Sequence, residues 1–411
     1  MSGVDPAVLD ERTSDLSCTT EELEVRQRVR RVLAEHVRPY VLDADRTGAF
    51  PHSQYRALVD AGLGALPVAK SDGGNGCSTA AYAIAMEEIT AVCGATSLVY
   101  MTQMHTAWPI LRWGNQEQRD RFVPALCSGD IYGAIAISEP SGGSDVASLR
   151  TSARPDGDGY LINGAKTFIT SGDVAGVIVV FATVDRSLGR RGVTAFLVEP
   201  ERGGVTASRP MSKMGMHGSS TVELAFEDCR VPASAVLGEV GAGFPIAMSS
   251  VVKTRISAAG QGLGLATGAL RAAVGWADER GLLDPRSPQG QPVQAELATL
   301  RAQVLAGRLL LLATARLVDT GDGSEVAEVS MAKLSLTELA VSVCDRVVDL
   351  MGGDGDRCGF EAERLLRDAL VTRIYDGTNQ IQQLLIARDT HTRTRAASSG
   401  SSTSGGREDR G

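Results

Sequence analysis

The sequence predicts an α+β protein of several domains, with helices first, a β-rich region next and helices again. Apolar residues recur at helical spacing behind a capping box formed by Thr19 and Glu22, and this pattern continues to about residue 130. Asn163-Gly164 lies between two apolar runs and predicts a hairpin, while the runs 176–184 and 193–198 predict strands. Helical spacing returns from Gly241 onward.

Changes in pattern divide the chain into five expected segments. They are a disordered arm at 1–18, an all-α domain at 19–130, a β-barrel-like domain at 131–237, a four-helix-bundle domain at 238–392 and a disordered tail at 393–411. The tail is predicted from a run of serine and glycine, which has too little apolar surface to bury a core.

Composition excludes several classes of protein. The 411 residues carry a net charge of −8, which argues against a broad nucleic-acid footprint, and no apolar run reaches the length of a membrane span. The chain has no basic-then-apolar leader, so a cytoplasmic location is expected. Seven scattered cysteines without C-x-x-C spacing and five separated histidines predict reduced thiols and no protein metal site.

A glycine- and serine-rich string at 136–145 is the first candidate binding loop. Gly142 and Gly143 would let the backbone approach a flat or anionic ligand, and Ser138 and Ser144 supply hydroxyl groups beside them. From composition alone, an ordinary loop before a strand explains the same residues.

Three further strings carry weaker signals. Phe168 followed by Thr170 could stack on a ring system and hydrogen-bond to its edge, although plain strand residues have the same pattern. The string 349–355 ends a helical pattern with glycines and is typical of a C-cap. Asp376 before Gly377 is, taken alone, typical of a turn.

In this order and at these separations, the strings resemble the acyl-CoA dehydrogenase family over residues 19–390. Further matching segments are Lys213-Met214-Gly215, Phe226-Glu227-Asp228, Val231-Pro232, Gly241-Ala242-Gly243-Phe244 and Arg364-Leu365-Leu366-Arg367-Asp368. The resemblance implies an N-terminal helical domain, a central β-domain and a C-terminal helical bundle. It also implies a flavoprotein oxidoreductase of class EC 1.3 that uses FAD to remove an α-proton and a β-hydride from an acyl thioester.

The resemblance also implies partners. The acyl group would be carried on CoA or on a carrier protein, electrons would pass to electron-transfer flavoprotein or another acceptor, and the protein would form a homodimer or homotetramer. No contact with nucleic acid or with a membrane is expected.

Site residues follow from the resemblance, position by position. Asp376 would be the catalytic base, and Arg280 and Gln291 would reach the FAD of the neighbouring subunit. The full set of expected cofactor contacts is Ile137, Ser138, Ser144, Phe168, Ile169, Thr170, Arg280, Gln291, Asp349, Gly352, Gly353, Thr378 and Gln380. The expected substrate contacts are Ser144, Arg255 and Gly377. The expected walls of the acyl pocket are Tyr100, Met101, Met104 and Trp108.

The chain departs from the family pattern at four places. The base is Asp376 where the family usually has Glu, which shortens its reach by about 1.5 Å. Val252 replaces the acid of an Asp-x-x-Arg motif, Asp349 replaces a Gln, and Leu283 replaces an aromatic residue. These departures predict that the substrate, rather than the reaction, distinguishes this protein.

Two alternatives remain open from the sequence. Nitroalkane oxidase, a relative, also uses Asp, so a flavin oxidase or an N-hydroxylating monooxygenase on the same fold is the first alternative. A non-catalytic flavoprotein fold used for assembly is the second.

Overall fold

The computed structural model describes residues 15–321, 325–357 and 361–401. The N-terminal region is helical, and its α-helices are α2 (Thr20–Val32), α3 (Val41–Thr47), α4 (His52–Asp60), α5 (Thr79–Val92), α6 (Gly94–Trp113) and α7 (Gln116–Cys127). The capping box predicted at the start of α2 is confirmed. The Thr19 hydroxyl accepts from the Glu22 N–H at 3.2 Å, and the Glu22 carboxylate accepts from the Thr19 N–H at 3.0 Å.

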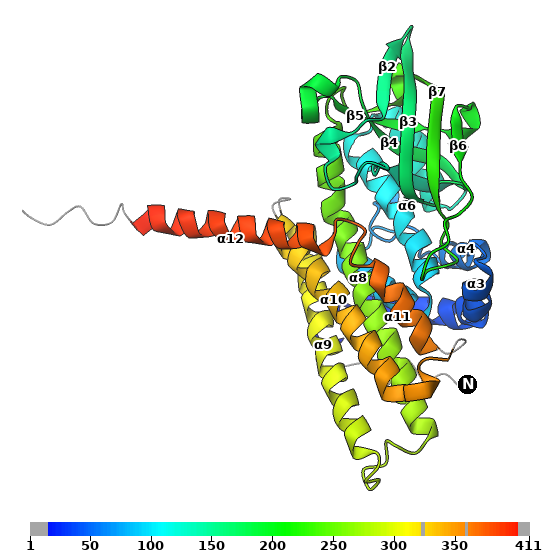
Figure 1. Cartoon of the computed structure of the whole chain (residues 1–411), viewed down its shortest axis with the longest axis vertical. Helices are drawn as coiled ribbons and strands as arrows, with labels where there is room; N and C mark the ends of the chain where they lie inside the picture. The colour runs from blue at the N-terminus through cyan, green and yellow to red at the C-terminus, as the bar shows by residue number, and fades with distance from the viewer. Residues whose placement is uncertain (1–14, 322–324, 358–360, 402–411) are drawn as a thin grey trace, which may run out of the picture.

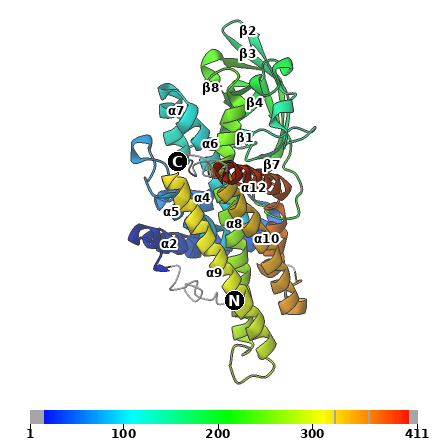
Figure 2. The same cartoon turned by 90° about the vertical axis from the view of Figure 1, so that its left-hand side faces the viewer.

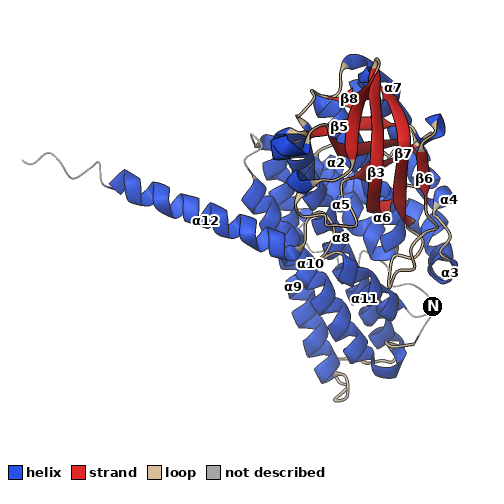
Figure 3. Ribbon diagram, turned by 45° about the horizontal axis from the view of Figure 1, so that its top comes forward, coloured by secondary structure: helices blue, strands red, loops and turns tan. Residues whose placement is uncertain are grey.

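A single β-sheet follows, and Figure 3 shows its strands in red with helices around them. Its strands are β1 (Tyr132–Ala136), β2 (Ser152–Asp156), β3 (Gly159–Thr170), β4 (Ala175–Thr183), β5 (Val193–Val198), β6 (Val205–Ala207), β7 (Thr221–Pro232) and β8 (Val236–Leu237). The order is β6-β7-β3-β2-β4-β5-β8, with β1 parallel to β4. β6 and β8 stand at the two ends, so the strands form an open sheet rather than the expected barrel-like closure.

The hairpin predicted at Asn163-Gly164 is wrong, because β3 runs straight through these residues. The register against β7 shifts there, and the Asn163 side chain exchanges hydrogen bonds with Asp228 on that strand. Gly164 is required by close packing, since a Cβ would lie 2.7 Å from Thr151. The dipeptide therefore forms a bulge, and the true hairpin turn joins β2 to β3 at Gly157.

Long helices complete the chain: α8 (Gly243–Glu279), α9 (Gln291–Thr320), α10 (Val326–Met351), α11 (Glu361–Val371) and α12 (Asn379–Ser401). Figure 1 shows α8, α9 and α10 running below the sheet, with α12 projecting sideways. α8 is central because glycines let its neighbours approach closely. A Cβ on Gly262 would lie 2.6 Å from the Leu336 carbonyl of α10, and one on Gly268 would lie 2.5 Å from the Ala91 carbonyl of α5.

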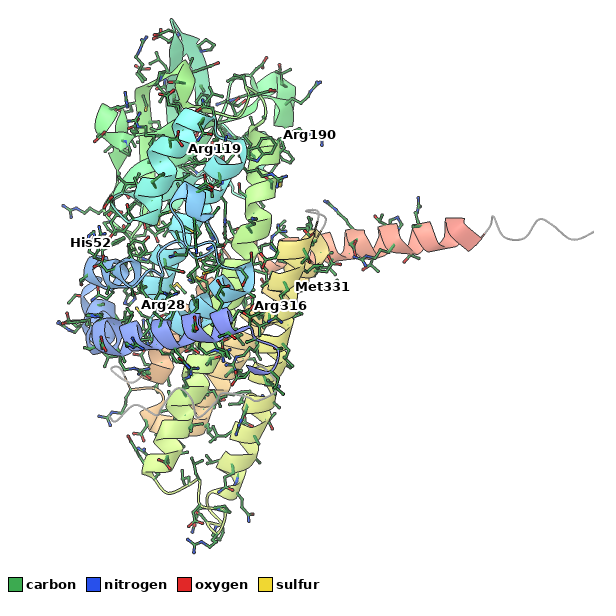
Figure 4. The ribbon with its side chains drawn as sticks, turned by 180° about the vertical axis from the view of Figure 1, so that it is seen from behind. Arg28, His52, Arg119, Arg190, Arg316 and Met331 are labelled. Carbon is green, nitrogen blue, oxygen red and sulfur yellow. The ribbon has the colours of Figure 1, made fainter. Side chains whose placement is uncertain are left out.

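Buried ion pairs tie the N-terminal helices to the C-terminal bundle. On α5, Glu87 pairs with Arg308 of α9 at 2.6 Å, and Glu88 pairs with Arg271 of α8 at 3.0 Å. Figure 2 shows α2, α5 and α9 on the same side of the molecule, and Figure 4 shows Arg316 of α9 beside α2. Arg316 pairs there with Glu22 at 2.9 Å, so residues distant in sequence form one body.

The expected disorder at both ends is only partly testable, because residues 1–14 and 402–411 lie outside the described residues. Within the described residues, the structure contradicts part of the predicted disorder at both ends. Asp15 pairs with Arg26 at 2.6 Å, and α12 continues through the start of the predicted tail to Ser401. Arg393 pairs with Asp389 one turn earlier and with Glu328 of α10, and both contacts support the helix there.

By length and composition, α9 could cross a membrane. It packs against α5, α8 and α10, and Leu297, Leu300 and Leu311 are buried in that contact. Its apolar content is therefore explained by a place in the bundle core.

Candidate active site

Asp376 lies in the turn between α11 and α12, where the backbone is left-handed. Its φ is 55°, and that of Gly377 is 86°. Asp tolerates this region better than most side chains, and glycine adopts it freely. The Gln382 amide closes the turn by donating to the Gly377 carbonyl at 2.8 Å and to the Asp376 carbonyl at 3.3 Å. The local sequence therefore fixes the backbone position from which the Asp376 side chain extends.

The pKa of the Asp376 carboxyl group is close to neutral pH. Its side chain is only 15% exposed, and burial raises its pKa from 3.8 to about 7, against the opposing effects of Lys333, the Thr254 hydroxyl and Arg255. Its Oδ2 has no hydrogen-bond partner among the described residues. A carboxyl group with a pKa near the working pH suits a general base.

Two buried cations stand beside this carboxyl group. Lys333 of α10 is fully buried and donates to the Gly377 carbonyl at 3.1 Å and to Asn379 Oδ1 at 2.7 Å. Arg255 of α8 is also buried and donates to the Ser330 hydroxyl at 3.2 Å. Burial lowers the pKa of Lys333 to about 8 and that of Arg255 to about 10, while the Asp376 charge raises both.

Sequence reasoning missed Lys333. The signal was its spacing, since Ser330, Lys333 and Thr337 recur on the buried face of α10. Arg255, expected to contact substrate, lies close to the turn that holds Asp376: a Cβ on Gly377 would be 3.8 Å from its guanidinium.

Buried aromatic side chains of α5 and α6 pack together, and α6 comes close to the carboxyl group. Tyr100, Met101, Met104 and Trp108, expected to line the acyl pocket, are all buried on α6. The sequence missed His105, which belongs to the same helix. Its Nδ1 is 3.9 Å from Asp376 Oδ1, and its ring stacks on Trp108 with centroids 5.8 Å apart.

On the sheet side, Phe168 is the most unusual candidate. This aromatic side chain is 69% exposed although it lies near the end of β3, and its φ is 59°. A non-glycine residue held in this strained conformation makes Phe168 a candidate for ligand contact. Ile169 is different: its side chain is buried in the sheet core, so the expected cofactor contact would be made by its backbone. Thr170, half-buried, ends the strand.

The Gly/Ser loop is held in place by a buried ion pair. Lys166 of β3 donates to the Ile137 carbonyl at 3.0 Å and to the Glu139 carboxylate at 2.9 Å. The Ser138 carbonyl accepts from the Thr167 N–H at 2.9 Å, so the loop is fixed beside Phe168. A Cβ on Gly143 would lie 2.6 Å from the Ser138 hydroxyl, so a larger residue there would displace that side chain.

These features fit a flat, phosphate-bearing cofactor. A Cβ on Gly142, with φ 153°, would meet nothing within 4 Å, and Ser144 beside it is exposed. Phe168 offers an exposed ring face next to this open backbone. Together they leave room for a ring system against β3 and for an anion at the loop. Among the described residues, no group of three His, Cys, Asp or Glu side chains could hold a metal ion.

The remaining expected cofactor contacts lie in two separate places. Thr378 and Gln380 stand at the start of α12, near Asp376, and the Thr378 hydroxyl accepts from the Ile381 N–H. Asp349, Gly352 and Gly353 stand at the opposite end of α10.

Arg280 lies near Gly352 and Gly353, because it pairs with Asp354 at the end of α10. Its guanidinium also lies over the Trp276 ring. Gln291 is exposed at the start of α9. From Lys333 to Gly352 the helix rises about 28 Å. One chain therefore does not bring Gly352 and Thr378 together, and Figure 1 shows the two ends of α10 well apart.

Comparisons with known proteins agree along the chain. Family models match over residues 19–130 (acyl-CoA dehydrogenase, N-terminal domain), 134–229 (middle domain) and 241–391 (C-terminal domain). The chain is 39% identical to the human mitochondrial short-chain specific acyl-CoA dehydrogenase over 351 residues, 85% of each protein.

Two solved structures are similar throughout. Butyryl-CoA dehydrogenase from Megasphaera elsdenii has 30% identity and a TM-score of 0.86, covering 91% of this chain and 98% of that one. The prolyl acyl carrier protein oxidase AnaB has 28% identity and a TM-score of 0.85, covering 91% and 99%.

Proposed function

This chain belongs to the acyl-CoA dehydrogenase family and is an oxidoreductase that dehydrogenates an acyl thioester, and we propose that Asp376 is its catalytic base and FAD its cofactor. The family is FAD-dependent. One observation carries the assignment of the base: a buried carboxyl group with a pKa of about 7 and a free oxygen, held on a rigid left-handed turn.

Asp376 would remove the α-proton of the thioester. The surroundings suit this step, because burial makes the carboxylate basic while Lys333 and Arg255 keep enough of it ionised at neutral pH. The N–H of Asp376 itself would polarise the thioester carbonyl and stabilise the enolate-like charge. The shorter reach of Asp requires the α-carbon to lie closer to the turn than it would with Glu.

FAD would be held by two sets of residues. Phe168 and Thr170 would pack on the ring system, and the loop containing Ser138, Gly142 and Ser144 would receive the pyrophosphate. When bound, FAD would accept the hydride from the β-carbon.

The separation of Gly352 and Arg280 from Thr378 supports a site completed by a neighbouring subunit. We therefore propose a homodimer or homotetramer. Electron-transfer flavoprotein as acceptor and a cytoplasmic location stay predictions.

The thioester carrier is either CoA or a carrier protein, and the similarity to AnaB supports testing both. The alternatives of a nitroalkane-oxidase-like enzyme and an N-hydroxylating monooxygenase gain no support from these matches.

The deciding experiment is an anaerobic titration of the FAD-loaded protein with short-chain acyl-CoA and acyl-carrier thioesters, following the flavin absorbance. We expect bleaching with at least one thioester and none with the Asp376→Asn variant, which should still retain FAD. Undiminished bleaching in that variant would remove Asp376 from the proposed chemistry.

A further inference from the structure

Asn379 is the first residue of α12, and its buried amide joins this helix to α10. The amide oxygen, Oδ1, accepts from the Lys333 ammonium at 2.7 Å. The amide nitrogen, Nδ2, donates to Glu338 Oε1 at 2.7 Å and to the Thr337 hydroxyl at 3.1 Å. Figure 1 shows the start of α12 beside α10, where these contacts are made.

The neighbours of Asn379 fix the orientation of its amide. The Lys333 ammonium can only donate, so the amide oxygen must face it, and the Glu338 carboxylate accepts, so the amide nitrogen faces Glu338. The Thr337 hydroxyl gives its proton to the Lys333 carbonyl at 2.8 Å, which leaves its oxygen to accept from the amide. A carboxylate at this position would meet a second negative charge, and an apolar side chain would take one acceptor from Lys333.

Lys333 connects this amide to the turn that holds Asp376. Its Nζ donates to the Gly377 carbonyl at 3.1 Å as well as to Asn379. The Gln382 amide donates to the same Gly377 carbonyl at 2.8 Å, so both lone pairs of that oxygen are used. The Lys333 ammonium is therefore held between one acceptor on the turn and one on Asn379.

The acceptor on Asn379 bears on two charges. The charged groups that act on Lys333 are Asp376 and Glu338, which favour its ammonium form, and Arg255, which opposes it. A hydrogen bond accepted from the ammonium favours that form as well. The ammonium in turn lowers the pKa of Asp376 against the larger effect of burial. Without Asn379 Oδ1, the charge beside Asp376 would be weaker and less well placed.

We propose that Asn379 is a positioning residue that holds the Lys333 ammonium against the turn of Asp376 and so sets the pH range in which this carboxyl group is ionised. The inference rests on the proposed function, in which Asp376 is the base, and adds a residue that acts through Lys333. Thr378 and Gln380, on either side in the sequence, were expected to contact FAD, whereas the side chain between them packs on α10.

The first test follows the pH dependence of flavin bleaching. FAD-loaded protein is mixed anaerobically with butyryl-CoA and, separately, with butyryl-pantetheine, from about pH 5.5 to about pH 9. Asn379→Leu keeps a similar volume and should move the rising limb of the profile upward by about 0.5–1 pH unit. Bleaching near pH 6 should therefore slow about 3- to 10-fold, and near pH 9 it should approach the wild-type rate.

Three further variants assign that shift. Asn379→Ser retains a hydroxyl acceptor and should move the profile less than Asn379→Leu. Lys333→Met removes the ammonium and should move it at least as far, and adding Asn379→Leu to Lys333→Met should move it no further. Gln383→Leu, which removes an exposed amide one turn further along α12, is the matched control and should leave the profile in place.

Urea unfolding follows the same carboxyl group without a substrate. Asp376→Asn cannot ionise, so the stability difference between wild type and this variant grows with pH until the carboxyl group is ionised in the folded protein. The pH at which this difference stops growing should rise in the Asn379→Leu background by the same amount as the kinetic profile. Retained FAD, read from the absorbance of each purified variant, shows that the protein is folded.

The outcomes separate this inference from the proposed function. If Asn379→Leu moves neither the pH profile nor the unfolding difference, the inference is overturned and the proposed function stands. A further shift on top of Lys333→Met would also overturn it, because Asn379 would then act without Lys333. If wild type is bleached by neither thioester, the proposed function is contradicted, and the unfolding measurement still decides the role of Asn379. If Asn379→Leu does not fold, Asn379→Ser supplies the same comparison with a smaller shift.

Discussion

Replacing Asp376 by Asn should abolish turnover and yet stabilise the protein above neutral pH. In the folded protein the pKa of this carboxyl group is about 7, against an ordinary value of 3.8. Between these two values the folded state holds a proton that the unfolded state has released, so the free energy of unfolding falls as the pH rises. Each pKa unit corresponds to 1.36 kcal/mol, which gives a penalty of about 4 kcal/mol at pH 8.

Asn cannot ionise, so the variant escapes this penalty. Relative to wild type, it should gain up to about 4 kcal/mol at pH 8, about half of that near pH 5.5 and almost nothing at pH 4. The assay is urea unfolding of the FAD-loaded protein at these three pH values, with flavin bleaching by a substrate thioester measured in parallel. Asp60→Asn, the same substitution at a side chain that is 67% exposed, is the control.

Two results would refute this reasoning. A difference in stability that does not change with pH would mean that the carboxyl group keeps an ordinary pKa. Lower stability of the variant at pH 8 would mean that the ionised carboxylate is held by its cations more strongly than burial destabilises it.

Further predictions concern the surrounding residues. Lys333→Met removes a cation that lowers the pKa of Asp376, so the pH dependence of flavin bleaching should move to higher pH; an unmoved profile would contradict the electrostatic role. Phe168→Ala should weaken FAD retention about 2- to 10-fold, measured as flavin released on dilution, and full retention would exclude the ring as a platform. Lys166→Met leaves the Glu139 carboxylate buried without its cation and should cost about 3–5 kcal/mol in thermal unfolding, whereas adding Glu139→Gln should recover part of the loss.

The sequence predicted the order of the elements because hydrophobic spacing and caps are local. Asp376 was found through the family resemblance, because Asp before glycine is by itself typical of a turn and only the order of several strings pointed to a base. The hairpin prediction at Asn163-Gly164 failed because the turn preference of this dipeptide is local, whereas pairing with β7 makes it a bulge within β3. His105 and Lys333 could not be found this way, because only tertiary packing makes their polar atoms buried and places them against Asp376.

α12 begins three residues after the base, and its first turn holds Gln382, whose amide secures both carbonyls of the Asp376 turn. A displacement of the C-terminal helix would therefore move the turn that holds Asp376, the proposed base. The helix projects beyond the body of the chain and exposes Leu384. A tag fused after Ser401 should consequently reduce flavin bleaching more than the same tag placed before Thr19. A neighbouring molecule bound to α12 would likewise change the position of the Asp376 carboxyl group.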